Sequence, residues 1–100
     1  GQVPNLPSEA IVEAPAIADN RGLTPIPQPP LPTGTAGTLA SRFAWVETVV
    51  EAASAKADRD KFIQALVLDG AVGSMEMAAK LADELLAAQA EYLPQFRGDS

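Results

Sequence analysis

The spacing of hydrophobic residues changes near residue 38. From there onward, apolar side chains recur at intervals of three and four residues, which is the repeat of an amphipathic helix. We predict three helices, over about residues 38–55, 58–69 and 74–92. Their apolar members include Leu39, Phe43, Val46, Val50 and Ala53 in the first, Phe62, Ile63, Leu66 and Val67 in the second, and Met75, Ala78, Ala82, Leu85 and Leu86 in the third.

The expected ends of these helices carry residues that favour helix termini. Thr38, Asp58 and Ser74 are predicted N-caps, because their side-chain oxygens can accept hydrogen bonds from the first free N–H groups. Gly70 is placed to end the second helix, and Pro94 limits how far the third can continue.

Before residue 38 the pattern excludes a long helix, since eight of the nine prolines lie between residues 4 and 32. Residues Ala10–Ala18 form a candidate strand, in which Pro15 indicates an edge position or a bulge. A turn is expected at Asn20–Gly22, where glycine can supply a positive φ.

The stretch Pro25–Pro32 is predicted to be extended, in part as polyproline II. It would be a rigid connector laid over a domain surface, or less favourably a ligand for an SH3-type groove. Thr33–Gly37 is expected to be a flexible hinge. The predicted fold is therefore mainly α, with an extended proline-rich arm over residues 1–37 followed by a three-helix segment over residues 38–100.

Composition excludes several kinds of chemistry. The 100 residues include no Cys and no His, and the net charge is -6 with a pI of about 4.4. Disulfides, thiol nucleophiles, zinc sites built on Cys or His and a Ser-His-Asp triad are therefore impossible within this chain. A negative chain is also a poor match for a phosphate backbone, so we expect no nucleic-acid partner.

The core is expected to be thin, because 19 of the 47 hydrophobic residues are alanine.

No apolar run is long enough for a membrane span, and no signal-peptide pattern is seen, so we expect a cytoplasmic protein with no membrane partner. Because the first residue is Gly and a dense motif begins by Val3, we interpret the chain as a piece of a longer protein.

The carboxylates and hydroxyls are the remaining candidates for catalytic groups. Glu9 and Glu13 would lie about 13 Å apart on a strand, too far for a glycosidase pair, and Glu13 is interpreted as partly buried and paired. Three aspartates lack the spacing of a calcium loop, and four serines have no adjacent base. These are Asp58, Asp60 and Asp69, and Ser8, Ser41, Ser54 and Ser74. Trp45 and Tyr92 are interpreted as core aromatics, with a role as interface aromatics the less favoured alternative. We assign no catalytic, cofactor-binding or metal-binding residue.

A set of ordered motifs nevertheless resembles the C-terminal segment of glycoside hydrolase family 4, in its alpha-glucosidase and alpha-galactosidase branch. The matching residues are Gly1-Asn5-Leu6-Pro7, Val12-Glu13-Ala14-Pro15, Gly22-Pro25, Leu31-Pro32, Val49–Ala53, Asp58-Arg59, Gln64–Leu66, Leu68-Asp69, Asp83–Leu86 and Tyr92–Phe96. The chain departs from the family pattern at Ala14, where Val is common, and at Gly70, where Pro is common.

This resemblance implies a parent enzyme that hydrolyses glycosides by oxidation at sugar C3, elimination, addition of water and reduction. It implies NAD bound by a Rossmann-type domain and a divalent metal, usually manganese, held by a Cys and a His. All of these would lie upstream of Gly1. The fold it implies is a fragment of a larger α+β substrate domain, in which the arm adds extended structure to a sheet.

Three hypotheses follow. In the first, the chain is the structural and oligomerisation portion of a family 4 glycosidase, inactive alone, whose partners are the missing N-terminal part and other copies. In the second, it is a standalone helical interaction module with a proline-rich arm. A hydrolase active by itself is the least favoured.

Overall fold

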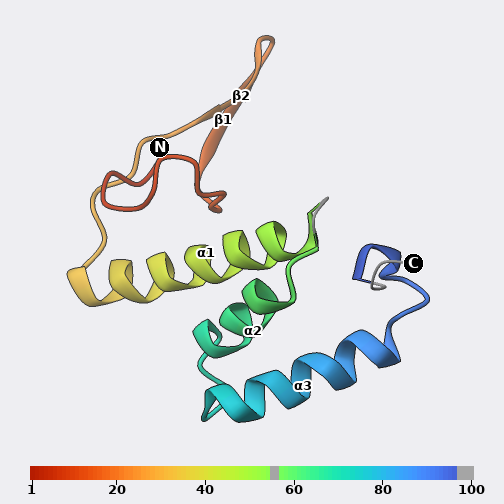
Figure 1. Ribbon diagram of the computed structural model, residues 1–100. Coiled ribbons are helices and arrows are strands. Elements are labelled where there is room, and N and C mark those ends of the chain that lie inside the picture. The colour runs from red at the N-terminus through yellow and green to blue at the C-terminus, as the bar shows by residue number, and fades with distance from the viewer. Residues whose placement is uncertain (55–56, 97–100) are drawn as a thin grey trace. The chain divides into compact units, whose positions relative to one another are not determined.

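The computed structural model describes residues 1–54 and 57–96. Its elements are β1 (Ala16–Asp19), β2 (Gly22–Pro25), α1 (Thr33–Ala53), α2 (Arg59–Leu68), α3 (Met75–Ala88) and a 3-10 turn, η1 (Pro94–Phe96) (Figure 1). The chain divides into two compact units, residues 1–43 and residues 44–100. The mainly helical fold class predicted from the sequence is confirmed.

In the first unit, β1 and β2 form an antiparallel hairpin that projects from the N-terminal loops (Figure 1). The predicted turn is present, and Gly22 adopts a φ of 108°, which suits glycine. Within the turn, the Asp19 carboxylate accepts a hydrogen bond from the Arg21 N–H at 2.8 Å. The hairpin therefore closes over Asn20 and Arg21.

The strand predicted over residues 10–18 is wrong in its extent, because regular pairing begins only at Ala16. Pro15 has no N–H, and its carbonyl accepts the last cross-strand bond, from Ile26 at 2.9 Å. The second strand lies at Gly22–Pro25, next to the proline-rich stretch, and was not predicted. A partner strand this close in sequence forms because the turn returns the chain directly onto β1.

The loops of the first unit are fastened to the proline-rich stretch. The Asn5 side chain donates to the Leu31 carbonyl at 2.8 Å and accepts from the Leu31 N–H at 2.9 Å. The Gln28 N–H donates to the Gln2 carbonyl at 2.7 Å. These bonds hold the extended stretch against the N-terminal loop. The small core that results contains Val3, Leu6 and Ala36, with Val12, Leu31 and Phe43 packed against it.

The predicted hinge over Thr33–Gly37 is wrong, because α1 already begins at Thr33. The Ala36 N–H donates to the Pro32 carbonyl at 2.9 Å, and the Ala36 side chain is buried in the core. Burial of Ala36 outweighs the cost of placing glycine in this part of the helix, which is about 1 kcal/mol for each glycine. Thr38 is consequently not an N-cap: it lies inside the helix, where its hydroxyl donates to the Gly34 carbonyl at 3.1 Å.

In the second unit, α2 and α3 begin where the sequence predicts. Asp58 accepts a hydrogen bond from the Lys61 N–H, and Ser74 accepts one from the Met77 N–H, both at 3.1 Å. Gly70 follows the end of α2 with a φ of 80°, as a left-handed C-terminal glycine does. The core of this unit joins Ile63 with Ala78 and Ala82, and Phe62, Leu66, Val72 and Ala79 pack around it.

The third helix ends earlier than predicted, at Ala88 rather than near residue 92. After Gln89 the chain makes tight turns, including a bond from the Tyr92 N–H to the Gln89 carbonyl at 2.9 Å. These turns lead into η1 and bring the Phe96 ring to 6.3 Å from the Phe62 ring, measured between centroids. Aromatic packing therefore replaces the last predicted helical turn. Across the described residues, no helix is long and apolar enough to cross a membrane.

Candidate functional site

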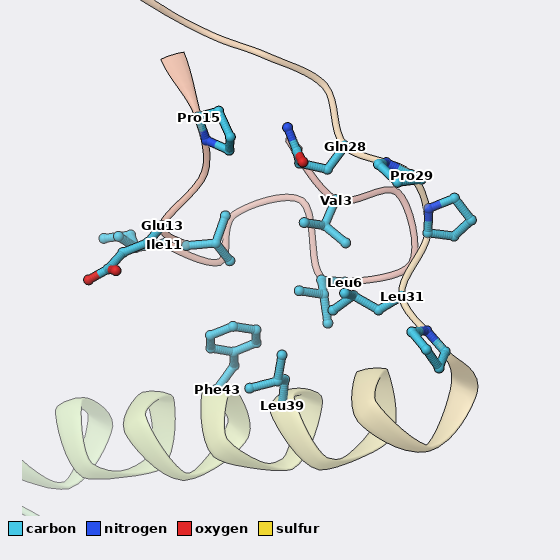
Figure 2. Close-up of a pocket in the computed structure, with 13 residues that line it drawn as sticks. Val3, Leu6, Ile11, Glu13, Pro15, Gln28, Pro29, Leu31, Leu39 and Phe43 are labelled. Atoms are coloured by element: carbon cyan, nitrogen blue, oxygen red, sulfur yellow. The ribbon is translucent and has the colours of Figure 1, made fainter.

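An open apolar cavity of about 640 Å³ lies in the first unit. It lies between the N-terminal loops, the proline-rich stretch and the first turns of α1 (Figure 2). Its lining residues are Val3, Leu6, Ile11, Val12, Glu13, Pro15, Gln28, Pro29, Pro30, Leu31, Pro32, Leu39 and Phe43. A hollow of this size and apolar character lies in the range of ligand-binding pockets.

Its walls are positioned by the contacts already described. The Asn5 bonds to Leu31 fix one wall, and the early start of α1 places Leu39 and Phe43 opposite it (Figure 2). At the mouth, Ile11 is 94% exposed. Such a large apolar side chain stays in contact with water unless another surface covers the cavity.

The cavity carries little reactive chemistry. Its only two polar lining residues among those described are Glu13 and Gln28. The Gln28 side chain donates to the Ile26 carbonyl at 2.8 Å. The prediction that Glu13 is partly buried and paired is wrong: it is exposed, and its carboxylate points away from Val3 and Leu6 (Figure 2). The cavity therefore suits apolar side chains rather than a bond-breaking reaction.

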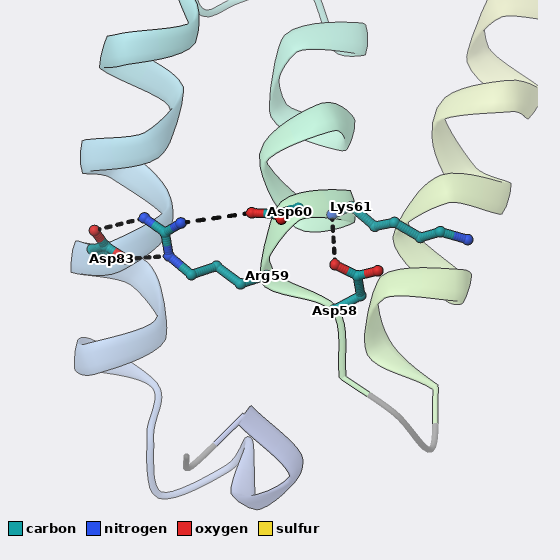
Figure 3. A network of polar contacts seen from close by, with 5 residues as sticks. All are labelled: Asp58, Arg59, Asp60, Lys61 and Asp83. Carbon is teal, nitrogen blue, oxygen red and sulfur yellow. Dashed lines mark hydrogen bonds and ion pairs between the residues drawn. The ribbon is translucent and has the colours of Figure 1, made fainter. Parts of the chain in front are cut away.

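Charged groups gather at a second place, along α2 (Figure 3). The Arg59 guanidinium makes a two-pronged contact with Asp83 of α3, at 2.8 Å from Nε and 2.9 Å from Nη2, and lies 3.8 Å from Asp60. Lys61 pairs with Glu51 of α1. The two pairs that join helices, Arg59 with Asp83 and Lys61 with Glu51, have side chains that are about half exposed, so they orient the helices more than they stabilise them.

The same contacts shift the pKa values of their groups. The hydrogen bond from Arg59 lowers the pKa of Asp83, and the reciprocal bond raises the pKa of Arg59. The bond to Glu51 raises the pKa of Lys61. Because the pKa of Asp83 is depressed on folding, its contribution to stability is present above the ordinary aspartate pKa. That contribution is lost as pH falls through the lowered value.

None of the aspartates considered as a calcium loop forms a metal site. Asp58 caps α2, Asp60 contacts Arg59, and Asp69 occupies the C-terminal end of α2. Within residues 1–54 and 57–96, no group of three or more acidic, His or Cys side chains is placed to hold a metal ion. The described residues therefore do not fit the divalent metal that the family resemblance implies.

Three of the four serine hydroxyls have structural roles. Ser41 donates to the Thr38 carbonyl at 2.7 Å and Ser54 to the Glu51 carbonyl at 2.8 Å, while Ser74 caps α3. Ser8 contributes its carbonyl, which accepts from the N-terminal ammonium at 2.8 Å. These contacts give no reason to treat any of the four as a nucleophile.

The two aromatic residues interpreted as core differ. Trp45 is half-buried, whereas Tyr92 is 73% exposed, so the core interpretation of Tyr92 is wrong. The early end of α3 removes Tyr92 from the helical face on which the prediction placed it.

Sequence reasoning missed the apolar cavity. Its parts come from three segments, and each segment alone is uninformative. The available signal was the pair of isolated apolar residues Ile11 and Val12 before a proline-rich stretch. A helix beginning at Thr33 would have completed the cavity, but that region was predicted to be a hinge.

The described residues thus contain an open apolar hollow in the first unit and helix-orienting ion pairs in the second. Comparison with known proteins identifies the family. Residues 1–72 match the family 4 glycosyl hydrolase C-terminal domain. The chain belongs to the family 4 glycosyl hydrolases, within their C-terminal domain.

Three glycosidases that are much longer than this chain are similar to it in sequence. An alpha-galactosidase of Rhizobium meliloti (strain 1021) is 32% identical over 99 residues, which cover 96% of this chain and 20% of the relative. An alpha-galactosidase of Bacillus subtilis (strain 168) is 31% identical over 100 residues, covering 97% of this chain and 23% of the relative. An alpha-glucosidase of Erwinia rhapontici is 33% identical over 93 residues, covering 93% and 20%. The chain spans about a fifth of the length of these relatives.

Proposed function

We propose that this chain is the structural and oligomerisation portion of a family 4 glycosidase acting on alpha-galactosides or alpha-glucosides, and that it has no activity alone. The observation that carries the proposal is the match to the C-terminal domain over residues 1–72, which includes the whole first unit with its open cavity. The names of the relatives support the choice of substrate class.

In this proposal, the remainder of the enzyme covers the cavity of the first unit. Burying apolar surface is worth about 25 cal/mol per Å², so Ile11 and its neighbours would contribute favourably to that association. Gln28 and Leu31 already bond to Gln2 and Asn5, which makes the proline-rich stretch a wall of the cavity. This supports the structural role over recognition of the stretch by an SH3-type groove.

The proposal places NAD and a divalent metal such as manganese in another part of the enzyme. The basis is the family resemblance, together with the lack of a metal-holding cluster among the described residues. The oxidation, elimination, addition and reduction implied by the family would then use groups that this chain does not supply.

Activity measurements test the proposal directly. We expect the chain alone to give no turnover of p-nitrophenyl alpha-galactoside or alpha-glucoside above the buffer rate, with NAD, manganese and a reductant present. The whole Rhizobium alpha-galactosidase serves as the positive control. Turnover by purified chain would contradict the proposed inactivity.

A chimera tests the structural role. In the Rhizobium enzyme, the matched segment is replaced either by this chain or by a Gly/Ser linker of equal length. We expect a folded, active enzyme from the first replacement and an inactive one from the second. Full activity of the linker variant would show that the segment is dispensable.

A further inference from the structure

After α3 ends at Ala88, the chain turns back toward the end of α1 in the second unit (Figure 1). We call residues 89–96 the strap. Its Gln95 side chain donates a hydrogen bond to the Ala53 carbonyl at 3.3 Å. Ala53 is the last residue of α1, and the last carbonyls of a helix have no partner within the helix. The strap therefore supplies a partner to the end of α1.

The strap also contacts the other two helices of this unit. The Phe96 ring is tilted by 53° against the Phe62 ring of α2, at the 6.3 Å given above, within the range of about 4.5–7 Å for favourable aromatic pairs. Two small open hollows, of about 210 and 140 Å³, lie beside it. Both are lined by Leu93 and Phe96 of the strap and by Leu86 of α3, and the smaller one also by Val49 of α1. The strap thus lies where the three helices meet.

The attachment of the strap is weak for a segment that touches three helices. None of the three residues of η1 is buried, and Tyr92 is 73% exposed. The Leu93 N–H lies 3.4 Å from the carbonyl of Ala90 to which it donates. The hollows leave part of the Leu93 and Phe96 surface without packing partners. Segments with few buried contacts and exposed hydrogen bonds open at a lower free energy than global unfolding requires.

The core between α2 and α3 does not depend on the strap. Ile63, Ala78 and Ala82 form this core, and the strap contributes none of the described residues that pack against it. Phe62 packs against the core and also against Phe96. The strap can therefore leave Phe62 while α2 and α3 remain packed together.

We propose that the strap is a conformational device that opens as a unit while α2 and α3 stay packed. Closed, it bonds the end of α1 and covers Phe62 and Leu86. Open, it exposes the apolar junction of the three helices. A surface that is hidden in one state and available in the other responds to any ligand that binds the open state alone. This inference goes beyond the proposed glycosidase role and does not depend on it.

Thiol labelling tests the proposal on the whole chain, which has no native Cys to interfere. Leu86→Cys places a thiol beneath the strap, and Ala78→Cys places one in the fully buried contact between α2 and α3. Met75→Cys is the exposed reference, at a residue that is 59% exposed. A buried thiol reacts with dithionitrobenzoate only when its cover opens. We expect labelling of Leu86→Cys to be about tenfold slower than that of Met75→Cys and about tenfold faster than that of Ala78→Cys.

Variants of the strap identify what holds it closed. Phe96→Ala removes the aromatic contact with α2. Gln95→Glu removes the donor to the end of α1 and places a negative charge at the negative end of that helix. In the Leu86→Cys background we expect labelling to become about tenfold and about threefold faster, and in the Ala78→Cys background to stay unchanged. Gln64→Glu, the same change at an exposed position of α2, is the matched control and should alter neither rate.

Circular dichroism establishes that each variant keeps its helix content. Equal labelling of Leu86→Cys and Ala78→Cys, or an equal response of both to Phe96→Ala, would show that strap and helices open together and would overturn the proposal. Labelling of Leu86→Cys as fast as Met75→Cys would show that the strap covers nothing, with the same consequence. No glycosidase activity enters this test, so its failure is separate from failure of the proposed function.

Discussion

Small side chains allow α2 and α3 to approach each other closely, since Ala78 and Ala82 of α3 are fully buried beside Ile63 of α2. A buried alanine removes little apolar surface from water, so this contact supplies less free energy than one built from leucine. The N-cap residues at the start of each helix are therefore expected to contribute noticeably to the stability of the helix pair. Asp58 and Ser74 are the two such N-caps in this unit.

Ser74→Ala is expected to lower the free energy of unfolding by about 1 kcal/mol, because the Met77 N–H loses its acceptor. Thr38→Ala is the matched control. The Thr38 hydroxyl donates to a carbonyl inside α1, so its loss should change stability by less than about 0.5 kcal/mol. Urea denaturation followed by circular dichroism measures both. A larger loss in Thr38→Ala would indicate that α1 begins at Thr38 after all.

At the scale of elements, the sequence predicted helices best where local chemistry alone determines them. Asp58, Ser74 and Gly70 mark the ends of α2 and the start of α3, and each uses contacts within a few residues. The start of α1 was missed because it depends on burial of Ala36 against Val3 and Leu6, about thirty residues away. No local pattern contains that contact.

The hairpin and the cavity show the same limit. The turn was predicted from Asn20 to Gly22, but the pairing of β2 onto β1 adds a strand that apolar alternation does not reveal. The cavity requires the N-terminal loop, the proline-rich stretch and α1 together. The family resemblance identified the class of protein correctly. It did not show which of the matching residues pack together or line the cavity.

Gly37 gives a direct test of the helix that replaces the predicted hinge. Outside the adjoining residues and the nearby backbone of α1, a Cβ at this position meets no atom within 4 Å. Gly37→Ala should therefore stabilise α1 by about 0.5–1 kcal/mol, through helix propensity and lower entropy of the unfolded chain. Gly70→Ala, at a φ of 80°, should destabilise by about 1–2 kcal/mol.

Thermal unfolding followed at the helical circular dichroism band distinguishes these outcomes. A rise in the midpoint for Gly37→Ala together with a fall for Gly70→Ala agrees with the observed helix. If Gly37→Ala instead lowered the midpoint, residues 33–37 would need the freedom of a hinge.

At the scale of the whole molecule, much of the apolar surface stays in contact with water. The buried hydrophobic residues of the described chain are mostly alanine, while many larger ones are exposed. The exposed large hydrophobic residues are Ile11, Ile17, Leu23, Ile26, Leu39, Val46, Val50, Val67, Leu68, Met75, Met77, Leu85 and Tyr92. Single exposed apolar residues are common on protein surfaces, so a site of association is indicated only where several of them gather in one place.

The cavity of the first unit concentrates part of this surface, so the isolated chain should bind the apolar dye ANS there. Ile11→Ser is expected to reduce the dye fluorescence markedly with little change in stability, because Ile11 lines the cavity and is 94% exposed. Met75→Ser is the matched control, since Met75 is 59% exposed on α3 and lies outside the lining. Equal fluorescence loss in both variants would show that the dye senses apolar surface in general. A selective loss at Ile11 would identify the cavity as the apolar surface most available to a partner, and would direct mutagenesis of the whole enzyme to that contact.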